Sequence, residues 1–187
     1  EGYGGLEHRS STVLLCKRDQ LPYLDHDPKK PKKSYEEFLG LCSHEYIHAW
    51  LVKRIEAKAF QPYDLGQRNY TRLLWLFEGF TSYYDDLQLV RSKCISEKRY
   101  LELLANTWNS VLRNPGRLKQ SVADSSFDAW TKYYQIDENT PNAVVSYYAK
   151  GSLIALGLDL LIRHHSMVKY SLDDVMRSLW QEHGNKG

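Results

Sequence analysis

The chain has 187 residues, of which 42% are hydrophobic and 26% charged, and its net charge is +2 at pH 7. This size and balance predict one globular domain with its own core, and the near-neutral charge excludes a strong field for nucleic acid or a membrane surface. No stretch approaches the run of about 20 apolar residues that a membrane helix needs, so we expect no membrane span. The basic run Pro28–Lys33 is broken by prolines and is interpreted as a solvated loop rather than a polyanion site.

The first ten residues, EGYGGLEHRS, have no starting methionine and lack the basic and apolar regions of a signal peptide. We therefore interpret residues 1–187 as a single domain excised from a longer protein. Three cysteines, Cys16, Cys42 and Cys94, show no paired spacing, which favours free thiols and a reducing compartment. A bacterial cytoplasmic location is favoured on this ground, and a periplasmic location stays open.

The pattern of elements begins with β structure and then becomes helical. The run Ser11–Cys16 is β-prone and follows the glycine-rich GYGGLEH, while residues 19–33 are interpreted as loop because they are rich in Pro, Asp and Lys. Ser34 and Glu37 have the spacing of a capping box, which predicts a helix from residue 34 to about residue 57. A loop that contains proline and glycine follows it.

Helices continue from there to the C-terminus. We predict helices over about 71–91 and 97–112, the second stopped by the sequence NPG, and a short helix within SSFDAWTKYY. The apolar stretch VSYYAKGSLIALGLDLLIRHH predicts a long central helix. A second capping box, Ser171 with Asp174, begins a last helix that ends at a glycine C-cap, Gly184. The predicted fold class is mainly α with a small N-terminal β element (α+β).

The sequence CSHEYIHAWL places two histidines four residues apart, with a glutamate directly after the first. On a helix His44 and His48 point the same way, and two imidazoles so placed fill two corners of a zinc tetrahedron. Glu45 is rotated by about 100° from His44, which keeps it out of the ligand set but within reach of a metal-bound water. H-E-x-x-H on a helix is the pattern in which a metalloprotease holds zinc and its general base.

A helix with surface polar residues is the alternative interpretation. Against it, the face that carries the two histidines also carries Leu41, Leu51 and Ile55, so we expect the histidines to face inward. Two inward imidazoles in ligand register with a carboxylate favour a metal site. The other five histidines have no partner at ligand spacing and are interpreted as structural or surface residues: His8, His26, His164, His165 and His183.

A catalytic zinc needs a third protein ligand and one open position. Glu78 is the candidate, because it lies in the otherwise apolar stretch LLWLFEGFTSYYDDL, where an unpaired carboxylate is costly to bury. Gly79 costs a helix about 1 kcal/mol relative to alanine, which suggests the close approach of another backbone. An exposed or salt-bridged Glu78 is the alternative.

HEYIHAW followed by LWLFEGFTSYYDDL resembles the gluzincin metallopeptidases, in which a glutamate on a second helix completes a His–His–Glu zinc site. The stretches YGGLEHRSS, QSVADSSFDAWTKYY, DENTPNAVVSYYAKG and SLDDVMRSLW are similar to the glycyl aminopeptidase family, metallopeptidase family sixty-one, whose members often carry a PDZ domain downstream. The resemblance implies the mostly helical part of a thermolysin-like zincin catalytic domain. The family's N-terminal β domain and C-terminal PDZ domain are expected to be absent from residues 1–187.

The resemblance implies one Zn²⁺ ion, held by His44, His48 and Glu78. Glu45 is then the general base for a zinc-activated water, and the implied activity is an aminopeptidase that removes small N-terminal residues such as Gly or Ala. Its partners are peptide substrates with a free N-terminus, no nucleic acid is expected, and the oligomeric state is open. Two alternatives also stay open: a zinc endopeptidase of the same fold and a non-catalytic peptide-binding domain.

Substrate binding is implied for two segments. GGLEH resembles the exopeptidase motif of the clan, in which a glutamate pairs with the substrate's α-ammonium; here that is Glu7, with Gly4 and Gly5 in the same segment. SYYAKG resembles the segment whose tyrosine donates a hydrogen bond to the tetrahedral oxyanion. In that register it is Tyr148, with Tyr147 as the second candidate. The alternative is that both tyrosines pack, since the chain has 14.

Overall fold

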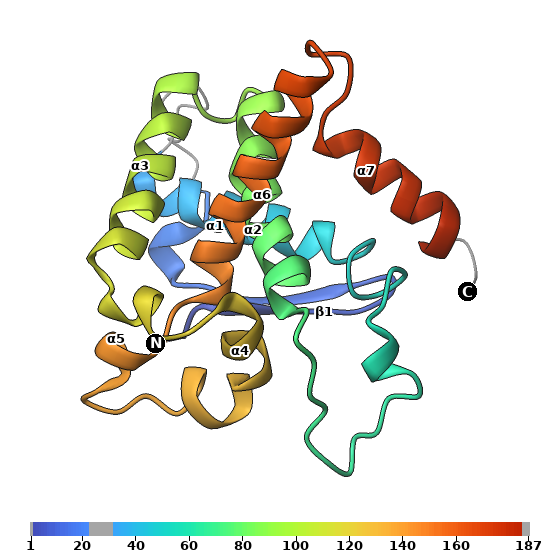
Figure 1. The fold of residues 1–187 in the computed structure, drawn as a ribbon. Helices are drawn as coiled ribbons and strands as arrows, with labels where there is room; N and C mark the ends of the chain where they lie inside the picture. The colour runs from blue at the N-terminus through green and yellow to red at the C-terminus, as the bar shows by residue number, and fades with distance from the viewer. Residues whose placement is uncertain (1, 23–31, 185–187) are drawn as a thin grey trace.

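The computed structural model describes residues 2–22 and 32–184 and has a mainly helical fold with one small sheet, which confirms the predicted fold class (Figure 1). Strands β1 (Gly4–Glu7) and β2 (Thr12–Leu15) pair antiparallel, with Gly4 opposite Leu15. The helices are α1 (Lys33–Ile47), α2 (Leu74–Arg91), α3 (Glu97–Arg113), α4 (Val122–Phe127), α5 (Thr140–Ala143), α6 (Tyr147–His165) and α7 (Leu172–Leu179). Short 3₁₀ or π-helical turns complete the elements: Arg18–Gln20, Lys58–Phe60, Pro115–Leu118, Ala129–Tyr133 and Trp180–Gly184.

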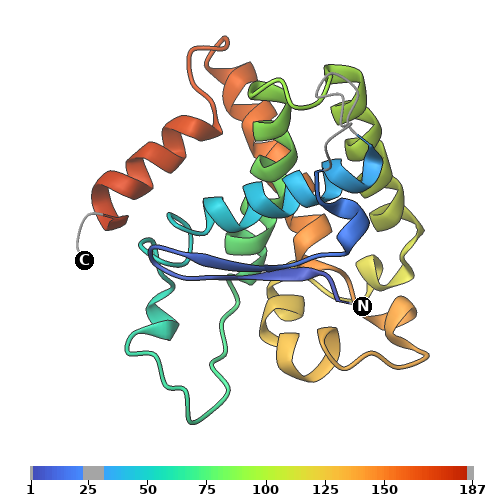
Figure 2. The ribbon, with the colours of Figure 1, turned by 180° about the vertical axis from the view of Figure 1, so that it is seen from behind.

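Helices α2 and α6 lie side by side at the centre of the fold (Figure 1). Helix α1 packs against α2 on one side and against the β-hairpin on the other, while α3 and α7 lie at opposite ends (Figure 2). A cluster of buried side chains joins α1 and the segment after it to α2, α6 and α7: Ile47, Leu51, Ile55, Ala57, Phe77, Phe80, Tyr83, Tyr84, Ala155 and Leu172. The core therefore fixes α1 relative to α2, the two helices that carry the predicted metal ligands.

The central helices approach each other most closely at two glycines. A Cβ built on Gly79 of α2 would lie 2.5 Å from the Cα of Gly151, and a Cβ built on Gly151 of α6 would lie 2.6 Å from the carbonyl oxygen of Trp75. No side chain fits between backbones at these distances. The close backbone approach that the sequence suggests at Gly79 is therefore confirmed.

The capping box predicted at the start of the first helix is wrong. The helix begins at Lys33 with Lys32 as its N-cap, so Ser34 lies inside the first turn. The Ser34 hydroxyl donates to the backbone oxygen of Asp19 at 3.1 Å, and a Glu37 carboxylate oxygen accepts from the amide of Gln20 at 3.0 Å. Both side chains tie the helix to the segment after β2, a tertiary contact that no local spacing indicates.

The predicted end of that helix, near residue 57, is also wrong. Helix α1 ends at Ile47, with His48 as its C-cap in a still helical conformation. The chain then turns at Val52, whose φ is +86°, and Leu51 pairs with Ile55 in an isolated bridge. Both side chains are buried, Leu51 completely, so tertiary packing overrides the helical pattern of this stretch.

The remaining element predictions are confirmed apart from their ends. The helix predicted over 71–91 begins at Leu74, and the one predicted over 97–112 ends at Arg113. The β-prone run becomes β2, SSFDAWTKYY contains the end of α4 and a π-helical turn, and the Ser171–Asp174 capping box is present. The glycine C-cap predicted at Gly184 is wrong, because α7 ends at Leu179 with Trp180 as its C-cap and a π-helical turn continues to Gly184. Strand β1 is an element that the glycine-rich sequence did not indicate, and most of the predicted loop 19–33, with the basic run, lies outside the described residues.

One segment, Thr140–His165, is long and apolar enough to cross a membrane by length and composition alone. The expectation that no stretch approaches this limit is therefore wrong as a statement about composition. The core helix of a folded domain passes the same test, and here the segment contains α6, which packs along α2 and buries Ala155 completely. The fold uses it as the central helix that the sequence predicts.

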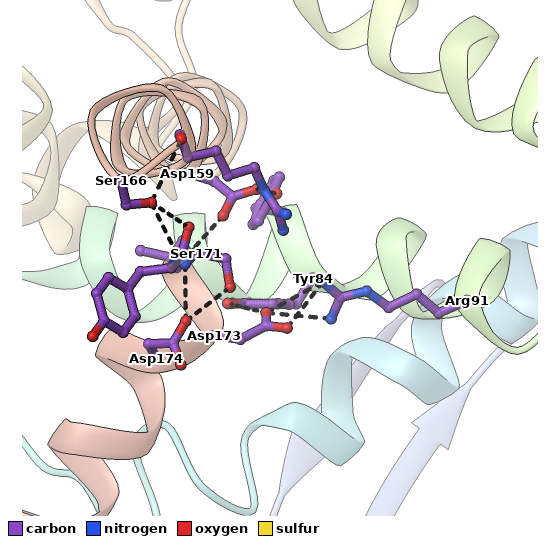
Figure 3. A network of polar contacts seen from close by, with 11 residues as sticks. Tyr84, Arg91, Asp159, Ser166, Ser171, Asp173 and Asp174 are labelled. Atoms are coloured by element: carbon purple, nitrogen blue, oxygen red, sulfur yellow. Dashed lines mark hydrogen bonds and ion pairs between the residues drawn. The ribbon is translucent and has the colours of Figure 1, made fainter. Parts of the chain in front are cut away.

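A network of polar contacts joins the end of α6 to the start of α7 (Figure 3). The Asp159 carboxylate is 5% exposed and accepts from the backbone N–H of Leu172 at 2.7 Å. It also accepts from the hydroxyl of Tyr83 and from the Arg163 guanidinium, both at 2.8 Å. Burial opposes ionisation, but these three donors outweigh it and lower the pKa of Asp159 below its ordinary value. The ionised carboxylate therefore stabilises the α6–α7 junction.

Replacing Asp159 with asparagine is expected to lower the free energy of unfolding by about 2 kcal/mol at pH 7, because one buried donor loses its acceptor. The folded pKa is depressed, so this contribution is fully present above the unfolded pKa of about 3.9 and is lost as pH falls through the folded value. Urea unfolding at pH 7 and at pH 3 compares the full contribution with the contribution below the unfolded pKa, where part of it is lost. A difference from wild type that stays constant between the two pH values would contradict the assignment.

Candidate metal centre

His44 of α1, His48 at the C-cap of this helix and Glu78 of α2 meet where the two helices pack together. His44 Nε2 and His48 Nε2 each lie 3.2 Å from Glu78 Oε2, and the candidate ligand atoms all lie within 4.8 Å of one another. The two imidazole rings are 4.7 Å apart and almost perpendicular. The structure thus brings together the three residues that the sequence predicts as ligands.

The donor set fits a zinc ion. Tetrahedral zinc with bonds of about 2.0–2.1 Å keeps its ligand atoms about 3.3 Å apart, close to the two His–Glu distances. Two imidazole nitrogens and one carboxylate oxygen leave one tetrahedral position open, as catalytic zinc sites require. Two buried atoms beside the cluster, Glu45 Oε2 and His48 Nδ1, have no hydrogen-bond partner within the described residues. Such orphaned polar atoms indicate a site that groups outside the chain complete.

Asp85 belongs to this centre, although the sequence reasoning did not single it out. Its Oδ2 lies 3.0 Å from His44 Nδ1, so the carboxylate holds the ring with Nε2 directed towards Glu78. Asp85 follows Glu78 by seven residues, which is two turns of α2 and therefore the same helix face. That spacing is the signal by which the sequence could have revealed it.

Carboxylates control the charge of the cluster. Burial lowers the pKa of His44, but hydrogen bonds to Asp85 and Glu78 outweigh it and raise the pKa to about 10. Burial likewise raises the pKa of Glu78, and the bonds to the two histidines outweigh it and bring the pKa to about 2. Glu78 is therefore ionised, and a cation that binds here takes the place of a proton on His44.

The predicted general base lies directly beneath the sheet. Glu45 is 7% exposed, and a Cβ built on Gly5 of β1 would lie 2.2 Å from its carboxyl carbon. Only a glycine lets the strand pass over this carboxylate. Burial raises the pKa of Glu45, while the imidazoles of His48 and His44 oppose the rise. A raised pKa brings the carboxyl closer to neutral pH, where a general base is most effective.

A cavity of about 630 Å³ opens over the cluster, between the helices and strand β1. Every residue that the sequence analysis assigned to the site lines it, with the exception of Tyr147: Gly4, Gly5, Glu7, His44, Glu45, His48, Glu78 and Tyr148. Tyr134 also lines it. This tyrosine comes from an irregular stretch in which no spacing indicates a role, so the sequence reasoning missed it.

Of the two candidate oxyanion donors, Tyr148 lines the cavity and Tyr147 does not. The ring of Tyr148 lies 6.2 Å from the ring of His44, and its hydroxyl lies 3.1 Å from that of Tyr134. Tyr147 is 1% exposed, and its hydroxyl donates a hydrogen bond to the hydroxyl of Tyr134. Burial and the Glu78 carboxylate raise the pKa of Tyr148, so its phenol stays protonated. The geometry therefore favours Tyr148 over Tyr147 as a donor into the cavity.

Glu7 lies at the end of β1 on the cavity wall, but its carboxylate already has a partner. Its Oε1 lies 3.0 Å from the Nζ of Lys53, and the two side chains are 20% and 27% exposed. Glu7 was expected to pair with a substrate ammonium, and no role was predicted for Lys53. Because Lys53 lies in the turn that replaces the predicted end of the first helix, local pattern could not place it near Glu7.

The histidines expected to be structural or surface residues lie away from the cluster. Those that the structure describes are exposed: His8, His164, His165 and His183. His26 lies outside the described residues. Within the described part of the chain, only one group of three or more His, Cys, Asp or Glu side chains has ligand geometry. The three cysteines are free, as predicted.

A sequence model of the M61 glycyl aminopeptidase family matches residues 37–154, the stretch that contains the metal cluster and Tyr148. A solved structure of an aminopeptidase N family protein from Idiomarina loihiensis is similar over 97% of this chain, with 52% sequence identity and a TM-score of 0.94. This chain corresponds to 30% of the length of that protein. No curated protein matches the chain. Because the family match extends over more than half of its residues, the chain belongs to the M61 glycyl aminopeptidase family.

Proposed function

We propose that this chain carries the catalytic site of a zinc-dependent aminopeptidase, which removes small residues such as Gly or Ala from peptides with a free N-terminus. The observation that carries the proposal is the convergence of His44, His48 and Glu78 beside the buried, unpaired carboxylate oxygen of Glu45. Membership of a peptidase family supports it. A non-catalytic peptide-binding domain has no need of such a carboxylate beside the three ligands.

When bound by the two histidines and Glu78, zinc supplies a Lewis acid and an activated water. Glu45 takes the proton of the attacking water and passes it to the leaving amine. Its carboxylate is held close to the cluster because Gly5 leaves room for it beneath β1. Burial raises its pKa, which eases the transfer of that proton to the leaving group.

Tyr148 donates a hydrogen bond to the oxyanion that forms when the carbonyl is attacked. Its position on the cavity wall, with its ring 6.2 Å from that of His44, supports this role. The hydroxyl of Tyr134 accepts a hydrogen bond from that of Tyr147 and is hydrogen-bonded to that of Tyr148, so the three phenols form one chain of hydrogen bonds. That chain restrains Tyr148 before substrate arrives.

Substrate enters along strand β1. Within the described residues this strand pairs only with β2, and its residues Gly4, Gly5 and Glu7 line the cavity. An extended peptide can therefore add to the free edge of β1 through main-chain hydrogen bonds. Glu7 then pairs with the α-ammonium of the first residue and limits cleavage to the N-terminal peptide bond.

One observation favours the endopeptidase alternative. Lys53 already neutralises Glu7, and a carboxylate that stays paired cannot select for a free amine. The two functions differ in their response to a blocked N-terminus. An aminopeptidase spares an acetylated peptide, whereas an endopeptidase of the same fold cleaves it.

The test is hydrolysis of glycyl and alanyl anilides by the zinc-loaded full-length protein that contains this chain, compared with N-acetylated peptides that contain the same residues. We expect the free amines to be cleaved and the acetylated peptides to be spared. Glu7→Gln is expected to raise KM about tenfold or more, since a hydrogen bond to a charged group is worth about 1.5–3 kcal/mol. Comparable cleavage of the blocked peptides would establish the endopeptidase. Stoichiometric zinc in the full-length protein without hydrolysis of either substrate would favour the binding domain.

A further inference from the structure

The turn after α1 holds Lys53 in a fixed place. The backbone N–H of Lys53 donates to the carbonyl of His48 at 3.2 Å, so the lysine is tied directly to a candidate metal ligand. The preceding residue, Val52, has a φ of +86°, a conformation that costs a β-branched residue about 1–3 kcal/mol. The burial of Leu51 and Ile55 on either side offsets this cost. A turn maintained against such strain positions its side chain reproducibly.

That side chain ends against Glu7. The Lys53 ammonium lies 3.0 Å from Glu7 Oε1, and both side chains are more than two-thirds buried. Like the N-terminus of a peptide, it is a primary ammonium on a carbon chain. It reaches Glu7 from outside the metal cavity, since Lys53 lines a neighbouring cavity of about 700 Å³ and not the cavity over the cluster. Glu7 lines the cavity over the cluster and Lys53 lines the second cavity, so their ion pair connects the walls of the two.

We infer that Lys53 occupies, in the free protein, the site that the α-ammonium of a peptide takes on Glu7, and that it competes with substrate for this carboxylate. The inference rests on the proposed function, in which Glu7 reads the free N-terminus. A substrate ammonium binds by displacing the lysine into the neighbouring cavity. A neutral, blocked N-terminus has no charge with which to displace the lysine, so the Glu7–Lys53 ion pair stays intact and this end of the peptide is not bound.

The neighbouring cavity determines how strongly the lysine competes. Arg9, Arg54 and Lys58 line it together with a single carboxylate, that of Glu56. A displaced Lys53 ammonium therefore enters a region where positive charges outnumber negative ones, which favours its return to Glu7. The competition lowers the affinity for every amine equally. Lys53 is in this sense a specificity-determining residue, because it makes an ammonium group a requirement for entry.

The experiment compares Lys53→Met with wild type on glycyl p-nitroanilide. Methionine keeps the aliphatic stem without the charge, so KM is expected to fall about fivefold while kcat changes less than twofold. Lys53→Arg keeps a cation and should keep the wild-type KM. Lys98→Met removes the same charge from an exposed position of α3 that lines neither cavity, and KM should not fall. In a Glu7→Gln background the effect of Lys53→Met should disappear.

A rise in KM for Lys53→Met would overturn the inference, because it would mean that the lysine holds Glu7 in its binding position. An unchanged KM would overturn it as well. If the full-length wild-type protein hydrolyses no anilide, the proposed function fails, and binding alone then tests the lysine. Glycinamide is titrated into the chain while NMR follows the backbone amides of Gly5 and Glu7. Tighter binding to Lys53→Met supports the competition, and equal or weaker binding excludes it.

Discussion

Glu45→Gln is expected to lower kcat for a glycyl anilide by about 10³-fold and to leave zinc bound. Glutamine has the shape of glutamate but cannot take a proton from the attacking water, and general-base catalysis contributes about 10²–10⁴-fold. The side chain is outside the ligand set, so zinc content after dialysis should equal that of wild type. Steady-state kinetics and metal analysis on the same preparation measure both quantities.

A matched variant separates the base from the ligands. Glu78→Gln makes the same chemical change at a residue whose carboxylate lies 3.2 Å from both imidazoles, so it should lose zinc and activity together. If Glu45→Gln also lost the metal, its carboxylate would belong to the ligand set. If it retained the wild-type rate, another group would have to be the base.

Gly79→Ala is expected to lower the free energy of unfolding by about 3 kcal/mol. Its Cβ would lie 2.5 Å from the Cα and 2.6 Å from the carbonyl carbon of Gly151. These are backbone atoms, so no rotamer change relieves the overlap and the two helices have to separate. The loss exceeds the gain of about 1 kcal/mol that alanine brings to a helix. Chemical denaturation followed by circular dichroism measures the change.

Gly157→Ala is the control, because it makes the same substitution in the same bundle without an overlap. No atom lies within 4 Å of a Cβ at this position of α6. We expect the free energy of unfolding to rise by up to about 1 kcal/mol, the helix-propensity difference. Equal effects of the two substitutions, in either direction, would show that the close contact between α2 and α6 does not matter.

The convergence of the three candidate ligands could be predicted from the sequence because these residues obey local rules. His44 and His48 are one turn apart on a single helix, and that spacing needs no knowledge of the tertiary fold. Glu78 could be predicted because a carboxylate in an apolar helix needs a partner. Gly79 indicated close packing in a similar way. Glycine destabilises a helix, so its presence suggests that a neighbouring backbone leaves no room for a side chain.

What could not be predicted depends on contacts between distant segments. Lys53 lies in a turn that forms because Leu51 and Ile55 enter the core. The spacing of these two apolar residues also fits a helix, so the sequence predicts a longer first helix than the structure has. Ser34 and Glu37 have the local spacing of a cap but bond to residues near β2. Both errors have one physical cause. These side chains fit a local pattern, but they make contacts with distant segments instead. Such contacts cannot be read from the sequence of one segment.

The glycine crossing also sets the dimensions of the site. Gly79 directly follows Glu78, and Gly151 lies one turn after Tyr148 on the opposing helix. The separation of the two backbones therefore determines how far the phenol of Tyr148 lies from the carboxylate of Glu78, the candidate ligand. Any side chain at the crossing would widen the site as well as weaken the fold. Mutations that restore stability elsewhere in the protein would leave that widening, and the lost activity, uncorrected.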